Sequence, residues 1–180
     1  MYQVYQEAVQ QGFTLWDTAP VYGNGSSEAL LGELAADDET IMLSTKFLPT
    51  ILHTRNALAK SFQKSCHRLK RKQIDIFWIH TANNVEKWTN ELIPILEKKQ
   101  IHMVGVSNHN LDQIKAAKDI LDQAGFRLGE VQNHFSLIYK QDEQNGVLDY
   151  CLTEGIAYFF LYDFGAGCFN WGLHRTTAFR

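Results

Sequence analysis

The 180-residue chain carries 45% hydrophobic and 12% aromatic side chains, which is enough apolar surface for a single domain with a sizeable core and argues against intrinsic disorder. Its 17 basic and 20 acidic residues leave a net charge of −3 without a long run of like charge, so nucleic acid is not expected as a partner. Three widely spaced cysteines predict reduced thiols rather than a metal site, and no stretch resembles a signal peptide or a membrane span, so we expect a cytoplasmic protein.

Short runs of β-branched and aromatic residues alternate with segments of helical periodicity, a pattern typical of a parallel sheet wrapped by helices. The predicted strands are Thr14–Thr18, Ile41–Lys46, Ile74–His80, Ile101–Ser107, Glu130–Ser136 and Ile156–Tyr162. The predicted helices are Tyr2–Gln11, Ser27–Leu34, Thr54–Leu69, Asn84–Lys99 and Asn110–Ala124. Thr54, Asn84 and Asn110 are their expected N-caps, and Gly125 is expected to end the last helix. Pro94 removes a backbone donor, which predicts that its helix is divided into two shorter pieces.

Nearly every predicted strand ends in a polar side chain. These residues are Asp17, Lys46, His80, Ser107 followed by Asn108, and Gln132, at intervals of roughly 25 to 34 residues, each close to one strand–helix unit. In a parallel barrel all carboxyl-terminal strand ends meet on one face, so side chains far apart in the sequence converge there. The pattern therefore predicts an active site on that face.

Tyr22 adds a candidate proton donor to this group. It follows Asp17 by five residues, just outside the first predicted strand, where its hydroxyl can turn back over the pocket. A neighbouring ammonium favours the phenolate form of a tyrosine, so we expect Lys46 to make Tyr22 a stronger acid and Asp17 to hold Lys46 charged and oriented. His80 is expected to hydrogen-bond an incoming carbonyl oxygen and to share in the proton relay.

Five segments in register resemble the aldo/keto reductase family: GFTLWDTAPVYGNGSSEALLG, STKF, IDIFWIH, GVSNH and EVQNHFSLIY, within a similarity that runs from about Tyr2 to Phe160. The resemblance implies a (β/α)8 or TIM barrel that uses NADPH to reduce small-molecule aldehydes or ketones to alcohols. It places the catalytic tetrad of the family on Asp17, Tyr22, Lys46 and His80. It assigns the residues that hold the nicotinamide carboxamide to Ser107, Asn108 and Gln132.

The chain carries about six of the eight strand–helix units of such a barrel, which takes roughly 250 residues. In relatives the last unit supplies basic residues that bind the cofactor phosphates. We therefore expect an incomplete barrel with poor NADPH affinity, whose two open sheet edges favour self-association.

Residues 161–180 depart from the family pattern, and Leu161 stands where relatives carry the aromatic ring that stacks on the nicotinamide. When permissible codons for Leu161–Arg180 are read one base later, the resulting sequence resembles the next segment of the family. This predicts a frameshift in the tail.

Three interpretations of the function are open at this point. The tetrad belongs to an active reductase, to a non-catalytic cofactor-binding module related to potassium-channel β-subunits, or to an inactive fragment of a disrupted gene. Taken singly, Asp17 is compatible with a strand-end cap, Lys46 with a solvated charge and His80 with a structural histidine. His109 and His134 flank the cofactor motifs, and we interpret both as structural.

Overall fold

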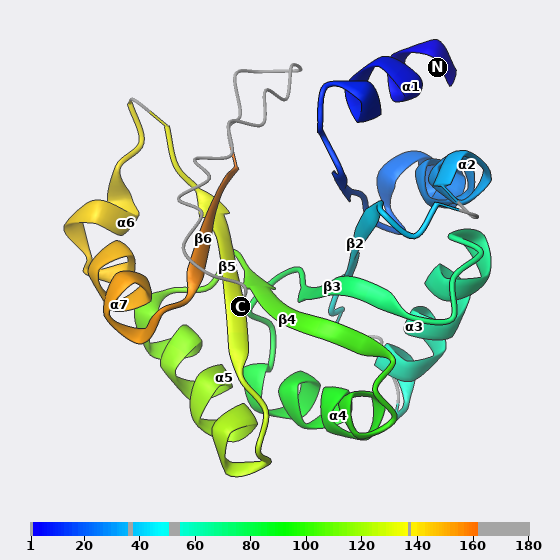
Figure 1. The fold of residues 1–180 in the computed structure, drawn as a ribbon. Coiled ribbons are helices and arrows are strands. Elements are labelled where there is room, and N and C mark those ends of the chain that lie inside the picture. The colour runs from blue at the N-terminus through cyan, green and yellow to red at the C-terminus, as the bar shows by residue number, and fades with distance from the viewer. Residues whose placement is uncertain (1, 36–37, 51–54, 137, 162–180) are drawn as a thin grey trace.

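The computed structural model describes residues 2–35, 38–50, 55–136 and 138–161, and these contain one sheet of six parallel strands. The strands are β1 (Leu15–Asp17), β2 (Met42–Phe47), β3 (Ile74–Ile79), β4 (Ile101–Ser107), β5 (Leu128–His134) and β6 (Ala157–Leu161). The helices are α1 (Tyr2–Gln10), the 3-10 helix η1 (Tyr22–Gly25), α2 (Ser26–Ala35), α3 (Ala57–Arg68), α4 (Val85–Glu97), α5 (Leu111–Gln123), α6 (Gln141–Gln144) and α7 (Val147–Glu154). Figure 1 shows the sheet curled into part of a barrel, with the helices around its outer side.

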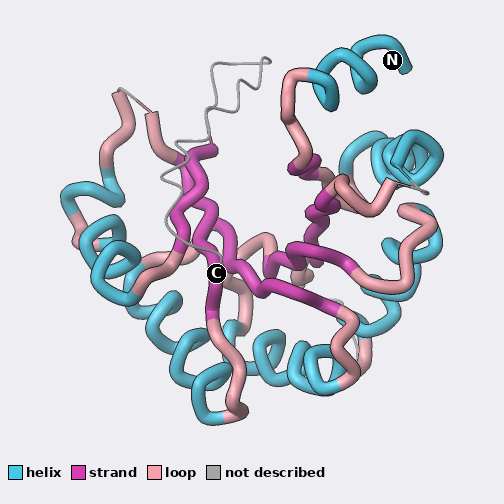
Figure 2. Tube along the Cα trace, in the orientation of Figure 1, coloured by secondary structure: helices cyan, strands magenta, loops and turns pink. Residues whose placement is uncertain are grey.

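The strands are paired in chain order from β1 to β6, and every pair is parallel. This is the order predicted for successive right-handed strand–helix units. The curled path of the sheet in Figure 2 confirms the predicted incomplete (β/α)8 barrel. Because all six strands run in the same direction, their carboxyl ends form one rim, which we call the carboxyl-terminal rim. The predicted self-association through the outer edges of β1 and β6 stays a prediction.

The hydrophobic core lies between the outer face of the sheet and the surrounding helices. Phe77 of β3 packs against Phe62 of α3, with ring centroids 5.2 Å apart. Phe47 of β2 packs against Trp88 of α4 at 4.9 Å. Each buried side chain of this size contributes about 1.5–3 kcal/mol to folding. This packing holds the strands in place and leaves their inner face available for polar groups at the rim.

Side-chain caps define the ends of two helices where the sequence predicted them. The Asn110 side chain accepts a hydrogen bond from the Gln113 amide at 3.0 Å, the Gln113 side chain accepts one from the Asn110 amide at 2.9 Å, and Gly125 follows α5 with a φ of 79°. Asn84 caps α4 by accepting from the Lys87 amide at 3.3 Å. Thr54, the predicted cap of α3, lies outside the described residues. Among the described helices, none has both the length and the apolar character needed to cross a membrane.

Three details differ from the prediction. The expected division at Pro94 is wrong, because α4 continues through this residue as one helix whose apolar side chains stay buried. The fifth strand spans Leu128–His134 rather than Glu130–Ser136. It begins earlier since Val104 pairs with Leu128 and Gly105 with Glu130, which accommodates one extra residue in β5. Helices α6 and α7 were not predicted. Residues 161–180, which are predicted to depart from the family pattern through a frameshift, lie almost wholly outside the described residues.

Gly105 allows Trp78 of β3 to lie across the inner face of β4. A Cβ atom at Gly105 would lie 2.2 Å from Cε3 of Trp78, a ring that is fixed by a 2.6 Å hydrogen bond from its Nε1 to Ser44 Oγ. We expect Gly105→Ala to lower the free energy of unfolding by about 1–3 kcal/mol through overpacking, as measured by urea denaturation.

Gly129→Ala is the matched control on the neighbouring strand. Its Cβ would meet Met103 Cγ at 2.5 Å, but the flexible methionine can move aside. A smaller loss of stability is expected there, and equal losses in the two variants would contradict the packing role of Gly105.

Candidate active site

The structure brings the polar residues predicted at the strand ends to the carboxyl-terminal rim. Asp17 is the last residue of β1, Lys46 lies one residue before the end of β2, and His80 directly follows β3. The backbone amide of His80 donates to the carbonyl oxygen of Phe47 at 2.8 Å, which extends the ladder between β2 and β3 by one residue. The backbone pairing of neighbouring strands therefore determines where these side chains stand.

A buried ion pair between Lys46 and Asp17 lies at the base of this group. The Lys46 side chain is fully buried, and its Nζ donates to Asp17 Oδ2 and, at 3.0 Å, to the carbonyl oxygen of Thr18. The other carboxylate oxygen of Asp17 accepts from Ser44 Oγ at 2.6 Å. Burial lowers the pKa of the Lys46 ammonium, while the Asp17 carboxylate acts in the opposite direction. The pair thus places an oriented cation beneath the rim.

Tyr22 stands directly over this cation. Nζ of Lys46 lies 5.3 Å from the centre of the Tyr22 ring. Tyr22 begins η1, where Gly23 and Asn24 adopt left-handed φ angles of 56° and 54° and turn the chain back towards the rim. The tyrosine side chain is 41% exposed, so a molecule from solvent can approach it.

His80 faces Tyr22 across the rim. The two rings meet edge to face, with centroids 6.4 Å apart. Burial, followed by the charge of Lys46, lowers the pKa of the His80 imidazole, and the Asp17 carboxylate opposes this shift. His80 Nδ1 is buried and has no hydrogen-bond partner among the described residues. A neutral imidazole in this position has one nitrogen to donate a hydrogen bond and one to accept.

A wall of amide and hydroxyl groups continues the rim beyond His80. Ser107 of β4 lies opposite Gln132 of β5, and the backbone amide of Asn108 donates to the carbonyl oxygen of Gln132 at 3.0 Å. Asn108 Nδ2 lies 3.0 Å from both the His80 carbonyl oxygen and Ser107 Oγ. Gln132 Oε1 is buried without a hydrogen-bond partner among the described residues. This carboxamide wall, formed by Ser107, Asn108 and Gln132, fits a ligand group that both donates and accepts hydrogen bonds.

Glu130 is a buried carboxyl group that the sequence analysis left unassigned. It lies two residues before Gln132, so strand alternation places both side chains on the inner face of β5. The side chain of Glu130 is 4% exposed, and its Oε2 has no hydrogen-bond partner in the described part of the chain. Burial, with a further contribution from the Asp17 charge, raises the pKa of Glu130 to about 8. An acidic residue inside a strand, two residues before Gln132 and so on the same face, was the signal that could have identified it.

The raised pKa of Glu130 predicts a pH-dependent loss of stability. The folded state keeps the proton up to about pH 8, whereas the unfolded chain releases it near the usual glutamate pKa of 4.5, so stability falls as the pH rises through this window. Glu130→Gln mimics the protonated form. We expect it to be more stable than the wild type by about 2–4 kcal/mol near pH 8, and to differ little near pH 4, in urea denaturation at both pH values.

Glu143→Gln, at an exposed residue of α6, is the control for Glu130→Gln and should change stability little at either pH. A stability difference between the wild type and Glu130→Gln that does not depend on pH would rule out a protonated Glu130.

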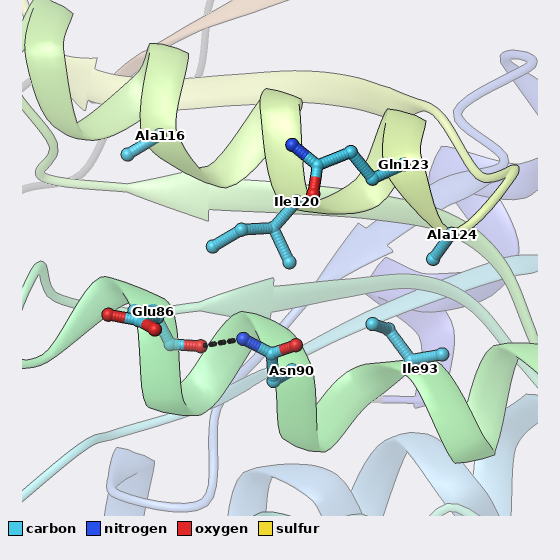
Figure 3. Close-up of a pocket in the computed structure, with 7 residues that line it drawn as sticks. All are labelled: Glu86, Asn90, Ile93, Ala116, Ile120, Gln123 and Ala124. Carbon is cyan, nitrogen blue, oxygen red and sulfur yellow. Dashed lines mark hydrogen bonds between the residues drawn. The ribbon is translucent and has the colours of Figure 1, made fainter.

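The pocket in Figure 3 is lined by none of the candidate site residues at the carboxyl-terminal rim. It has a volume of about 530 Å³ and is formed between α4 and α5, with Ile93 and Ile120 among its lining residues.

Within the described ranges, no group of three or more His, Cys, Asp or Glu side chains could hold a metal ion. Cys66 and Cys151 are free thiols, and Cys168 lies outside the described residues.

Comparison with known proteins identifies a family. A family model described as the aldo/keto reductase family matches residues 1–170. The chloroplastic pyridoxal reductase of Arabidopsis thaliana is 30% identical over 174 residues, which cover 86% of this chain and 47% of the relative. An uncharacterized oxidoreductase of Mycobacterium bovis is 32% identical over 142 residues, which cover 76% of this chain and 42% of the relative. The chain thus spans about half the length of the curated relatives it matches.

Solved structures share the fold. A glycerol dehydrogenase from Gluconobacter oxydans superimposes with a TM-score of 0.77 at 23% identity, covering 88% of this chain and 52% of the other. An aldo/keto reductase from Klebsiella pneumoniae, solved in complex with NADP and acetate, gives a TM-score of 0.76 at 18% identity, covering 87% and 55%. At these identities the likeness establishes the architecture of the strands and helices.

Proposed function

Since the chain belongs to the aldo/keto reductase family, we propose that it reduces aldehydes or ketones to alcohols with NADPH as the reductant. The observation that carries this proposal is the buried Lys46, which is paired with Asp17 and lies under the ring of Tyr22. Burying an ammonium group costs free energy of folding unless a charged partner compensates for the loss of water, so a buried lysine at this place suggests a functional role. Its position at the rim of a curled parallel sheet is the position in which barrel enzymes carry out their chemistry.

In the proposed reaction Tyr22 is the general acid. NADPH, when bound, supplies the hydride that reduces the carbonyl carbon. Tyr22 gives its hydroxyl proton to the carbonyl oxygen, so that a neutral alcohol leaves. The ammonium of Lys46 stabilises the phenolate that remains, and Asp17 keeps this ammonium in place. His80, neutral because burial lowers its pKa, donates a hydrogen bond to the carbonyl oxygen and orients it towards Tyr22.

Ser107, Asn108 and Gln132 are proposed to hold the carboxamide of the nicotinamide ring. Gln132 Oε1, which lacks a partner among the described residues, accepts from its amide nitrogen. The Ser107 hydroxyl supplies a donor for its oxygen. Asn108, whose Nδ2 donates to Ser107 Oγ and to the His80 carbonyl oxygen, orients that hydroxyl. The NADP complex of the Klebsiella pneumoniae relative supports a nicotinamide cofactor in this fold.

Two readouts on the wild-type chain test this function. NADPH, supplied in large excess because weak affinity is expected for the incomplete barrel, should raise the melting temperature, since a ligand that binds only the folded state stabilises it. NADPH is also expected to be consumed in the presence of a panel of aldehydes and ketones. A rise in melting temperature without consumption would instead support a cofactor-binding module without catalysis. The absence of both effects would refute the proposed function.

A further inference from the structure

Asn133, the residue after Gln132, binds the backbone of His109, the residue after Asn108. Asn133 Oδ1 accepts from the His109 amide at 3.0 Å, and Asn133 Nδ2 donates to the His109 carbonyl oxygen at 2.7 Å. The two residues are buried. One side-chain amide therefore satisfies both backbone groups of a residue in the loop between β4 and α5, a loop that would otherwise leave them without partners.

Asp142 of α6 determines which way the Asn133 amide points. Asn133 Nδ2 also donates to Asp142 Oδ2 at 2.7 Å. A carboxylate only accepts hydrogen bonds, so the atom of Asn133 that faces it must be the nitrogen, and the oxygen must face the His109 amide. Tyr158 of β6 donates to the same Asp142 oxygen at 2.6 Å, and burial and this carboxylate raise the pKa of the Tyr158 hydroxyl. Its proton therefore stays available as a donor.

The imidazole of His109 is fixed as well. Its Nδ1 lies 2.7 Å from the carbonyl oxygen of Ser107, which can only accept, so Nδ1 carries the hydrogen. Burial lowers the pKa of His109 to about 4, and the ring is therefore neutral at physiological pH. Both the backbone and the ring of His109 are thus held between β4 and β5.

This arrangement holds Asn108 in a left-handed conformation. Its φ angle is 58°, a region that non-glycine residues rarely occupy and that the surrounding structure must enforce. In this conformation the Asn108 amide nitrogen reaches the Gln132 carbonyl oxygen, and its side chain reaches the His80 carbonyl oxygen and Ser107 Oγ. Because His109 directly follows Asn108 in the chain, fixing the backbone of His109 also restricts the conformation of Asn108.

We propose that Asn133 and Asp142 are positioning residues for the carboxamide wall. They hold His109, and through it they keep Asn108 in the conformation that aligns Ser107, Asn108 and Gln132. Neither residue is proposed to touch the cofactor or the reacting atoms. The inference rests on the proposed function, because it assigns these residues to the binding of the nicotinamide.

Asn133→Asp tests this role with almost no change in volume. The new carboxylate cannot donate to the His109 carbonyl oxygen, and it faces the carboxylate of Asp142. Hydrogen exchange of the Asn108 backbone amide, which donates to the Gln132 carbonyl oxygen, should become about tenfold faster than in the wild type. NADPH affinity should fall about tenfold, in line with the net value of one or two buried hydrogen bonds. Exchange is measured by NMR without cofactor, and affinity by calorimetry.

Tyr158→Phe is the matched control, since it removes a donor to Asp142 Oδ2 and leaves both bonds between Asn133 and His109 in place. It is expected to leave the exchange of the Asn108 amide and the NADPH affinity near wild-type values, whatever its effect on melting temperature. A second comparison covers the case in which Asn133→Asp does not fold. Asp142→Ala should weaken NADPH binding, and Asp142→Asn, which keeps an acceptor for Asn133 Nδ2, should largely restore it.

The outcomes separate the two levels of the inference. If the wild type binds NADPH and both Asn133→Asp and Asp142→Ala bind it equally well, the positioning role is overturned and the proposed function stands. If exchange of the Asn108 amide is unchanged in Asn133→Asp, the role is overturned as well. If the wild type does not bind NADPH, the proposed function fails and the positioning role falls with it.

Discussion

Replacing Tyr22 by Phe is expected to lower NADPH-dependent turnover of an aldehyde by about 100- to 10,000-fold, which is the usual contribution of a positioned general acid. The change removes only the hydroxyl group that gives up the proton. The phenyl ring keeps its place 5.3 Å from Lys46 Nζ. Affinity for NADPH should therefore stay unchanged, and the loss should appear in kcat. Steady-state kinetics and calorimetry on the same preparations measure the two quantities.

Tyr2→Phe is the control for this experiment, because Tyr2 is an exposed tyrosine on α1. It should leave turnover and melting temperature unchanged. Near-parental turnover in Tyr22→Phe would show that another group supplies the proton, and the proposed mechanism would have to be abandoned even though the family and fold would stand.

Glu28→Ala is expected to lower the free energy of unfolding by about 2–4 kcal/mol, because it leaves the buried Thr45 hydroxyl and the Arg68 guanidinium, whose side chain is 28% exposed, without their shared partner. Glu28 of α2 is fully buried. Its carboxylate accepts from Thr45 Oγ1 of β2 at 2.6 Å and from Arg68 Nε of α3 at 2.5 Å. The residue thus joins three elements just behind the turn that carries Tyr22. Urea denaturation monitored by tryptophan fluorescence measures the loss.

The ion pair between Lys118 and Asp122 on α5 supplies the comparison, since the Asp122 side chain is 43% exposed. Asp122→Ala should cost less than about 1 kcal/mol. A loss for Glu28→Ala as small as that for Asp122→Ala would contradict the view that Glu28 holds α2 and α3 to the sheet.

The strand order and the rim residues could be predicted because they depend on patterns local to each strand–helix unit. Asp17, Lys46 and His80 each end or follow a run of apolar, β-branched or aromatic residues, and parallel pairing then brings them together. Asn110 and Gly125 marked the ends of α5 for the same reason, since caps act on the nearest turn of a helix. The roles assigned to the rim residues stay predictions.

The remaining features depend on contacts between distant segments. The strand β5 begins at Leu128 because an irregular pairing with β4 accommodates an extra residue, which no local pattern in β5 reveals. The helix α4 tolerates Pro94 because its buried side chains pack on the sheet and on neighbouring helices. The hydrogen bonds from Asp142 through Asn133 to His109 join a helix, a strand and a loop that are separate in the sequence. Sequence patterns cannot predict such bonds, because only the folded chain brings these residues together.

The most direct measurement of the central claim follows the hydride itself. The wild-type chain is incubated with an aldehyde and with NADPH that carries deuterium at the nicotinamide carbon from which the hydride leaves. Mass spectrometry of the product is expected to show deuterium on the carbinol carbon, and the yield should fall sharply in Tyr22→Phe. An alcohol that forms without deuterium, or a label that stays in NADPH while the aldehyde is left unchanged, would contradict the account.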